Sequence, residues 1–184
     1  MRLLLFWVID FLVYFKYNIS MVILGFDPGL ATLGYGVIEK DEKGNCRAID
    51  CGIVQTPKGE SLAVRLCMLE QAINQIIEKF KPNEIAMEEL FFAKNVKTAL
   101  SVAHARGVLI LCCNKACGRI FEYTPLQIKQ SLTGYGRADK KQMQKMVKML
   151  LNLNKVPSPD DAADALAVAL THARVNKLGE HFII

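Results

Sequence analysis

Three strand-like segments follow one another directly near the start of the chain, and this run constrains the fold more than any other feature. The apolar stretch Val22–Phe26 ends at Asp27, which a Pro-Gly turn follows. Leu33–Glu39 and Ala48–Gln55 come next, separated by the polar sequence DEKGN. Strands joined by links this short pair with their neighbours in antiparallel fashion. The sequence therefore predicts a three-stranded meander whose first strand is buried.

The rest of the domain alternates between helical and strand patterns. Ser61 is placed to cap an amphipathic helix that runs to about Phe80, before a Lys-Pro-Asn stop. The later strands are predicted at Glu84–Glu88 and Ile120–Tyr123, and the later helices at Val96–Cys117, Pro125–Leu132, Asp139–Leu151 and Asp161–Val175. This order predicts an α/β fold with a five-stranded mixed sheet flanked by helices on both faces, a layout that fits the ribonuclease-H-like class.

The 184 residues suffice for one compact domain, which we expect to span residues 21–176. Residues 1–20 are interpreted as an apolar N-terminal extension, with Met21 as the original start. Asp10 interrupts its apolar run, which is shorter than the roughly 20 residues that span a bilayer. Residues 177–184 form a C-terminal tail. Neither end is expected to take part in the chemistry.

The cysteines have no Cys-x-x-Cys spacing and no nearby histidines, which argues against zinc. Their apolar neighbours predict buried, reduced thiols in a cytoplasmic protein. These residues are Cys46, Cys51, Cys67, Cys112, Cys113 and Cys117.

Positive charge is concentrated in the second half of the chain. Residues 1–92 carry 9 Lys and Arg against 12 Asp and Glu, whereas residues 93–184 carry 14 against 6. A basic half on one small domain favours a polyanionic partner, nucleic acid first. A protein with an ordinary basic surface has the same composition, so charge alone leaves both interpretations open.

Acidic residues occur at three places that the predicted fold brings to one region. Asp27 and Glu88 each end a short apolar strand, and Asp161 and Asp164 share one face of a helix. Each acid also has a purely structural explanation. Asp27 can be a turn residue, Glu88 can be a solvated strand end, and the helical acids can be favoured by capping and by the helix dipole. Asp164, one turn into an alanine-rich helix, is explained least well in this way.

Taken together, the four acids form a cluster that is unfavourable unless cations bind it. Hard oxygen ligands select Mg²⁺, with Mn²⁺ as a substitute. Two ions per subunit, about 3.5–4 Å apart, would suit in-line phosphodiester hydrolysis to a 5′-phosphate and a 3′-hydroxyl. No covalent protein nucleophile is needed.

Four sequence blocks resemble the RuvC family of Holliday junction resolvases, in the family's order and spacing. They are GFDPGLATLGYGVI, AMEELFFAKNVKTAL with a following ARG, LQIKQSLTGYGRADK and DDAADALAVALTHA. The resemblance covers about Met21 to Val175. It implies a nuclease domain that resolves four-way DNA junctions by paired symmetric nicks, in homologous recombination and DNA repair.

The resemblance also assigns roles to individual residues. Asp27, Glu88, Asp161 and Asp164 match the family's metal-binding catalytic acids. Phe91 matches an aromatic residue used at the junction centre, although a buried phenylalanine is an equal alternative. Lys129 and Lys140 match basic residues near the scissile phosphate, and both are also explicable as solvated lysines. Phosphate-contacting lysines give salt-sensitive affinity without base readout.

The family acts as a homodimer, and two equivalent sites related by a two-fold axis suit a two-fold symmetric junction. The apolar helix Val96–Cys117 is the candidate interface. The resemblance further implies work beside the RuvA–RuvB branch-migration complex in the cytoplasm, with no small-molecule cofactor and no integral membrane span.

Three other classes of protein share parts of this pattern. An actin- or Hsp70-like ATPase or a sugar kinase also opens on a strand followed by Asp-x-Gly, but it needs a second such domain. A non-catalytic junction-binding protein has no reason to keep four acids. A nuclease of the same fold that acts on RNA remains an alternative, and the basic loop and Phe91 favour branched DNA over it.

Overall fold

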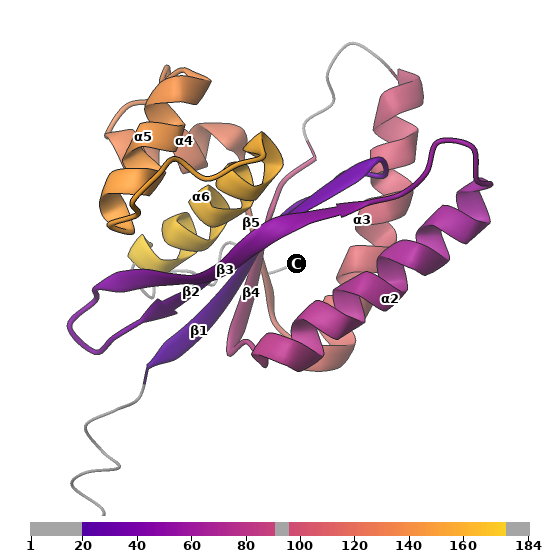
Figure 1. The fold of residues 1–184 in the computed structure, drawn as a ribbon, viewed down its shortest axis with the longest axis horizontal. Helices are drawn as coiled ribbons and strands as arrows, with labels where there is room; N and C mark the ends of the chain where they lie inside the picture. Colours follow the sequence, from indigo (N-terminus) through magenta and orange to yellow (C-terminus); the bar gives the residue numbers. More distant parts are fainter. Residues whose placement is uncertain (1–19, 91–95, 176–184) are drawn as a thin grey trace, which may run out of the picture.

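The computed structural model describes residues 20–90 and 96–175, and the structural statements below concern those residues. They form a five-stranded sheet in the order β3-β2-β1-β4-β5, with helices on both faces (Figure 1). The strands are β1 (Met21–Asp27), β2 (Thr32–Lys40), β3 (Cys46–Gln55), β4 (Glu84–Glu88) and β5 (Ile120–Tyr123). The helices are α2 (Leu62–Phe80), α3 (Val96–Cys117), α4 (Pro125–Thr133), α5 (Lys140–Leu150) and α6 (Asp160–Arg174).

The predicted α/β fold is confirmed, including the mixed sheet and its antiparallel meander. β1 pairs with β2, and β2 with β3, in antiparallel fashion, whereas β4 runs parallel to both β1 and β5. The observed bounds of β4, α3 and β5 equal the predicted ones, α2 ends at Phe80 as expected, and the other elements differ by one or two residues at one or both ends. Ser61 caps α2 as expected, its hydroxyl accepting from the Val64 amide.

Each face of the sheet has its own core because side chains alternate along the strands. Leu24 and Phe26 of β1 pack with α2 and α3, whereas Ile23 packs with α4, α5 and α6. Figure 1 shows these two helical layers on either side of the sheet. The side chains of Leu24 and Phe26 are fully buried, so β1 is the central buried strand that the sequence predicted.

The prediction that the cysteines are buried is wrong for most of them. Cys112 and Cys113 are buried, Cys67 is exposed, and the other three are half-buried. Cys67 lies on the outer part of α2, where helical periodicity turns it away from the sheet. Over the described ranges, 20–90 and 96–175, no helix is long and apolar enough to cross a bilayer. Phe91, nearly all of the N-terminal extension and the 177–184 tail lie outside those ranges.

Candidate active site

Two of the predicted acids lie side by side at one edge of the sheet. β1 and β4 run parallel, and their register pairs Phe26 with Met87. Asp27 and Glu88 follow these partners directly, each as the last residue of its strand. Because β1 and β4 run in the same direction, their C-terminal ends place the side-chain carboxyl groups of Asp27 and Glu88 at the same end of the sheet.

The helix α6 supplies the other two acids because it lies unusually close to the sheet. A Cβ atom added to Gly34, the register partner of Asp27, would overlap the carbonyl oxygen of Asp161. A Cβ at Gly36 would come within 2.6 Å of the Leu166 amide nitrogen, and one at Gly25 within 2.7 Å of the Ala169 nitrogen. These glycines form a groove in the sheet surface that seats the helix backbone.

The start of α6 does not use its aspartates as caps. Its N-cap is Pro159, which makes no side-chain capping bond, and Asp160 and Asp161 lie in the first turn. The structural explanation by capping is therefore wrong for these two residues, although the helix dipole still favours acids there. Asp164 follows one turn later, with its side chain 32% exposed.

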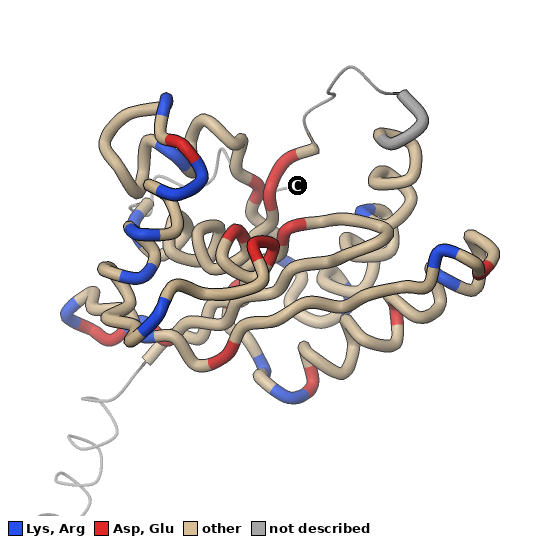
Figure 2. Tube along the Cα trace, turned by 45° about the horizontal axis from the view of Figure 1, so that its top comes forward, with Lys and Arg blue, Asp and Glu red and all other residues tan. Residues whose placement is uncertain are grey.

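A cleft of about 290 Å³ opens where these elements meet. It brings two of the predicted acids together with both predicted lysines. Its lining residues are Glu88, Pro125, Ile128, Lys129, Lys140, Met143, Asp164 and Ala167. In Figure 2 acidic segments meet near the middle of the molecule, and basic residues of the α4–α5 region lie beside them.

Burial, together with the charges of neighbouring acids, raises the pKa of three of the four acids. Burial raises the pKa of Asp27 to about 7, with the charges of Asp164 and Asp161 adding to the effect. Burial likewise raises the pKa of Glu88 to about 7, helped by the charges of Asp27 and Asp164. Burial also raises the pKa of Asp164, against the opposing charge of Lys140. Shifts of this kind mark a site where negative charge is held close together.

Lys140 partly neutralises this charge. Its ammonium group lies 3.2 Å from a carboxylate oxygen of Asp164 and 3.2 Å from one of Asp160. Burial disfavours the charged form of Lys140, but the two carboxylates outweigh it and raise its pKa. A capping box between Asp139 and Gln142 fixes the start of α5 and so the position of Lys140.

Asp160 has a role in this site that sequence analysis missed. Its carboxylate accepts a hydrogen bond of 2.8 Å from the side-chain amide of Gln144 and forms an ion pair with Lys140, so Asp160 joins α5 to α6. Lys140 and Gln144 are four residues apart, so their side chains lie on one face of the predicted helix. This spacing, together with the adjacent acids Asp160 and Asp161, is the sequence signal that would have identified the contact.

The donor set fits a hard divalent cation. Carboxyl groups of β4 and α6 line the cleft, the charge of Asp27 at the end of β1 is coupled to them, and none of the described residues that line the cleft is a cysteine or a histidine. Among the residues with described positions, no three acidic, histidine or cysteine side chains converge into a ready-made ion site. Lys140 already contacts Asp164, so a cation entering the site would compete with that ammonium group.

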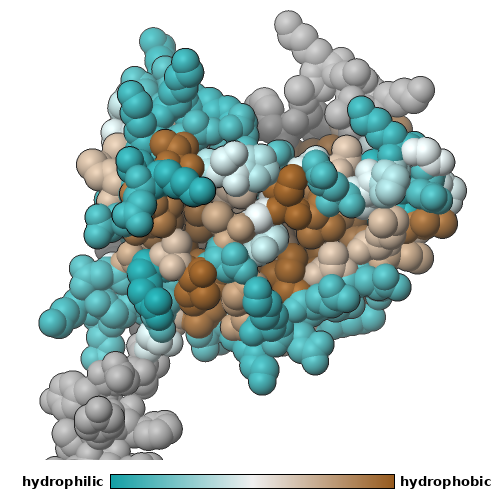
Figure 3. Space-filling model, viewed as in Figure 1, coloured by the Kyte–Doolittle hydropathy of each residue, from teal (hydrophilic) through white to brown (hydrophobic). Residues whose placement is uncertain are grey.

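Lys129 also lies where the sequence predicted, in α4 and facing the cleft. Its positive charge opposes the rise in the Glu88 pKa, so the two side chains are electrostatic neighbours. The surface formed by α5 is mostly hydrophilic (Figure 3), and four of the eleven residues in its sequence KKQMQKMVKML are lysines. This face therefore suits a polyanion. Phe91 was predicted to join the site, and its position lies outside the described residues.

A mixed sheet of this strand order, covered on both faces and carrying acids at the carboxyl edge of its central strands, defines the ribonuclease-H-like class. Residues 23–172 match the family model described as crossover junction endodeoxyribonuclease RuvC. The chain belongs to this family.

Curated relatives carry the same description. A crossover junction endodeoxyribonuclease RuvC from Alkaliphilus oremlandii is 53% identical over 164 residues, which cover 89% of this chain and 99% of the relative. One from Clostridioides difficile is 54% identical over 159 residues, covering 86% of this chain and 93% of the relative.

Two solved structures of Holliday junction resolvases are similar to this chain. RuvC of Thermus thermophilus in complex with a Holliday junction substrate is 33% identical, with a TM-score of 0.83, and the match covers 89% of this chain and 99% of that one. The yeast mitochondrial Holliday junction resolvase Ydc2 is 18% identical with a TM-score of 0.59, covering 83% of this chain and 78% of that one. At that identity the likeness concerns the fold.

Proposed function

We propose that this chain resolves four-way DNA junctions by paired symmetric nicks, in homologous recombination and DNA repair. The observation that carries the proposal is a cleft in which partly buried acids of β4 and α6, Glu88 and Asp164, lie beside Lys129 and Lys140, with the charge of Asp27 from β1 acting on the same site. The match to a RuvC solved with a Holliday junction substrate supports the choice of a branched DNA.

Asp27, Glu88, Asp161 and Asp164 are the proposed metal-binding catalytic acids, and Mg²⁺ is the proposed ion, two per subunit. When bound, such ions supply Lewis acidity at the attacking water and at the leaving oxygen. Water adds to the phosphorus as the P–O3′ bond breaks, leaving a 5′-phosphate and a 3′-hydroxyl. The protein holds the donors on rigid elements, since β1 and β4 are central strands and α6 is seated on glycines.

Lys129 and Lys140 are proposed to contact the phosphates of the cut strand. Both line the cleft, and Lys140 lies close to the acids without being buried, its side chain 53% exposed. An exposed ammonium on a mostly lysine-bearing helix face attracts a phosphate without reading sequence. Phe91 is proposed to stack at the junction centre, by family resemblance alone.

We further propose that two copies form a homodimer through α3. Leu100 and Leu111 are 57% and 54% exposed, and their eleven-residue separation is about three helical turns, so both lie on one face. Gly107 lies between them, and a Cβ added there would meet nothing. This stripe, which also carries the exposed His104, presents two exposed leucines in the single chain. Cooperation with RuvA–RuvB and a cytoplasmic location are proposed from family membership only.

The test uses the protein from Met21 onwards and a labelled synthetic four-way junction, with Mg²⁺ or with EDTA, beside an Asp27→Asn variant. Paired, symmetric and ligatable nicks that require metal and vanish in the variant are expected. Tight junction binding with no cutting in either Mg²⁺ or Mn²⁺ would identify a binding protein instead. Cleavage of RNA with no preference for the junction would overturn the substrate assignment.

A further inference from the structure

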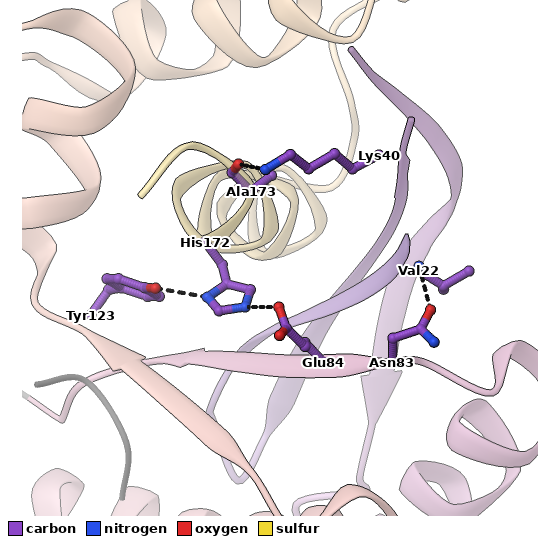
Figure 4. Close-up of polar contacts among 7 residues, drawn as sticks. All are labelled: Val22, Lys40, Asn83, Glu84, Tyr123, His172 and Ala173. Carbon is purple, nitrogen blue, oxygen red and sulfur yellow. Dashed lines mark hydrogen bonds and ion pairs between the residues drawn. The ribbon is translucent and has the colours of Figure 1, made fainter. Parts of the chain in front are cut away.

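A chain of polar contacts lies beneath α6 and leads from the end of β5 to the start of β4, which is the end of β4 opposite to Glu88 (Figure 4). The Tyr123 hydroxyl is 2.7 Å from Nδ1 of His172, and Nε2 of His172 is 2.7 Å from a carboxylate oxygen of Glu84. His172 is 8% exposed and Tyr123 is 1% exposed. We call Tyr123, His172 and Glu84 the far-end network.

The far-end network has one consistent set of hydrogen-bond directions. With its proton on Nε2, His172 donates to the Glu84 carboxylate and accepts from the Tyr123 hydroxyl at Nδ1. Burial lowers the pKa of His172 against the effect of Glu84, which agrees with a neutral ring. Phe121 packs against the same imidazole at 4.2 Å between ring centroids, so the ring is fixed by both polar and apolar contacts.

This network reaches every element that carries a proposed metal ligand. Glu84 begins β4, whose last residue is Glu88. The preceding residue, Asn83, exchanges hydrogen bonds with Val22 at the start of β1: its side-chain oxygen accepts from the Val22 amide at 2.7 Å, and its own amide donates to the Val22 carbonyl at 2.8 Å. His172 lies near the end of α6. The starts of β1 and β4 and the end of α6 are thus joined at one place.

Tyr123 extends the connection back towards the acids. It is the register partner of Glu88 in the parallel pairing of β4 with β5. Its carbonyl accepts a hydrogen bond of 2.9 Å from the Glu89 amide, while its hydroxyl reaches His172. One residue therefore contacts both the strand end that bears Glu88 and the far end of α6.

The seat of α6 on the sheet sets how closely the helix approaches the strands. Where α6 crosses β1 and β2, glycines face the helix backbone: Gly25 lies at Ala165 and Ala169, and Gly36 lies at Ala165 and Leu166. A glycine permits this close approach but contributes no side chain that resists sliding of the helix along its axis. Lys40 adds one restraint at the far end, since its ammonium donates to the Ala173 carbonyl at 2.5 Å.

We propose that His172 is a positioning residue of the acid cluster, which sets the axial position of α6 relative to β1 and β4. His172 is eleven residues from Asp161, about three helical turns, so both side chains lie on one face of α6. Sliding of the helix would move Asp161 and Asp164 together with respect to Asp27. The inference rests on the proposed function of these acids as the metal site.

The test compares Tyr123→Phe, His172→Gln and His172→Leu with the parent protein. Tyr123→Phe deletes one hydroxyl, His172→Leu removes both hydrogen bonds, and His172→Gln keeps a donor and an acceptor. Thr171→Val is the matched control, because the buried Thr171 hydroxyl donates to the Ala167 carbonyl, a hydrogen bond that stays within α6. It lowers stability without releasing the helix from the sheet.

Three quantities are measured on each variant: Mn²⁺ affinity by electron paramagnetic resonance without DNA, thermal stability, and the position of α6 in metal-free crystal structures. We expect His172→Leu and Tyr123→Phe to weaken Mn²⁺ binding roughly 10-fold or more, as loss of supporting contacts around metal ligands commonly does. Their crystal structures should show α6 displaced along its axis. His172→Gln should recover part of the affinity, and Thr171→Val should lose stability but keep the parent's Mn²⁺ affinity.

An α6 that stays in place in the crystal structure of His172→Leu would overturn the proposal, as would equal losses of affinity in Thr171→Val and Tyr123→Phe. Failure of the proposed function is separable, because it would appear as a parent protein that binds Mn²⁺ but does not nick the junction. The crystallographic measurement needs neither metal nor DNA, so it decides the role of His172 in either case.

Discussion

Gly34 lies directly beneath the backbone of Asp161, so close that a single added carbon atom would overlap the Asp161 carbonyl oxygen. Gly34 is also the register partner of Asp27. The absence of a side chain at one position of β2 therefore sets how near the first turn of α6 approaches the end of β1. The spacing of the acidic cluster depends on this contact more directly than on any hydrogen bond within it.

Replacing Gly34 with alanine should consequently damage the site out of proportion to the size of the change. The methyl group must push α6 away from the sheet, because the atoms it meets are backbone atoms that cannot rotate aside. We expect a destabilisation of about 1–3 kcal/mol from overpacking and a loss of nicking of roughly 100-fold from misplaced acids. Urea unfolding and single-turnover cleavage measure the two effects.

Gly59→Ala is the control for this change, since a Cβ atom there would meet nothing within 4 Å. It should leave both cleavage and stability near the parent values. If Gly34→Ala cleaves as fast as Gly59→Ala, the close seat of α6 is not what positions the acids.

Sequence patterns predicted the elements well but not their contacts. Apolar runs and caps located β4, α3 and β5 to the residue, because burial periodicity and turn residues are local properties. The role of Gly34 could not be predicted, since a glycine in a strand signals close approach without naming the partner. The contact of His172 with Glu84 joins residues 88 positions apart, and only the folded chain brings them together.

The acidic cluster should make the metal-free protein less stable as the pH rises. Asp27 has a pKa of about 7 in the folded chain against 3.8 as its ordinary value. Between these values the folded state binds more protons than the unfolded state, so the free energy of unfolding falls as the pH rises from about 4 through about 7. Asp27→Asn removes the contribution of Asp27 to that dependence. We expect the variant to be about 1–3 kcal/mol more stable than the parent near pH 8 in EDTA.

Chemical denaturation of both proteins across this pH range, with EDTA present, measures the difference. The gain should shrink towards pH 4 and vanish only below it, where Asp27 is protonated in both states. The variant should not cut junctions, so greater stability with loss of activity is the expected pair of results. Equal stability of parent and variant at high pH would mean that Asp27 is not held in a repulsive environment.

Binding of Mg²⁺ should release protons near neutral pH. Asp27 and Glu88 both have pKa values of about 7 and are therefore partly protonated there. A cation binds their ionised forms, so affinity should fall by about 10-fold or more per pH unit below 7 and level off above pH 8. Calorimetric titrations in two buffers of different ionisation enthalpy count the released protons. An affinity that is flat between pH 6 and 8 would contradict the raised pKa values.

Removing the charge of Lys140 should separate metal binding from DNA binding. The Lys140 ammonium pairs with Asp164 and Asp160, so Lys140→Gln leaves the carboxylates more negative, and we expect the metal to bind about 2- to 5-fold more tightly. Junction affinity should fall, with the salt dependence of log K reduced in slope by about 0.9 for one lost phosphate contact. The free energy of unfolding should change by less than about 1 kcal/mol because the ion pairs are solvent-exposed.

Lys145→Gln is the matched control, because Lys145 is exposed on the same helix and does not line the cleft. It removes the same charge and should leave Mg²⁺ affinity and the rate of nicking unchanged, with at most a small loss of junction affinity. Calorimetry for the metal, and junction titrations at several salt concentrations, compare the two variants directly. Weaker Mg²⁺ binding in Lys140→Gln than in Lys145→Gln would show that Lys140 supports the cation site. It would contradict the expectation that the Lys140 ammonium group competes with the metal for Asp164.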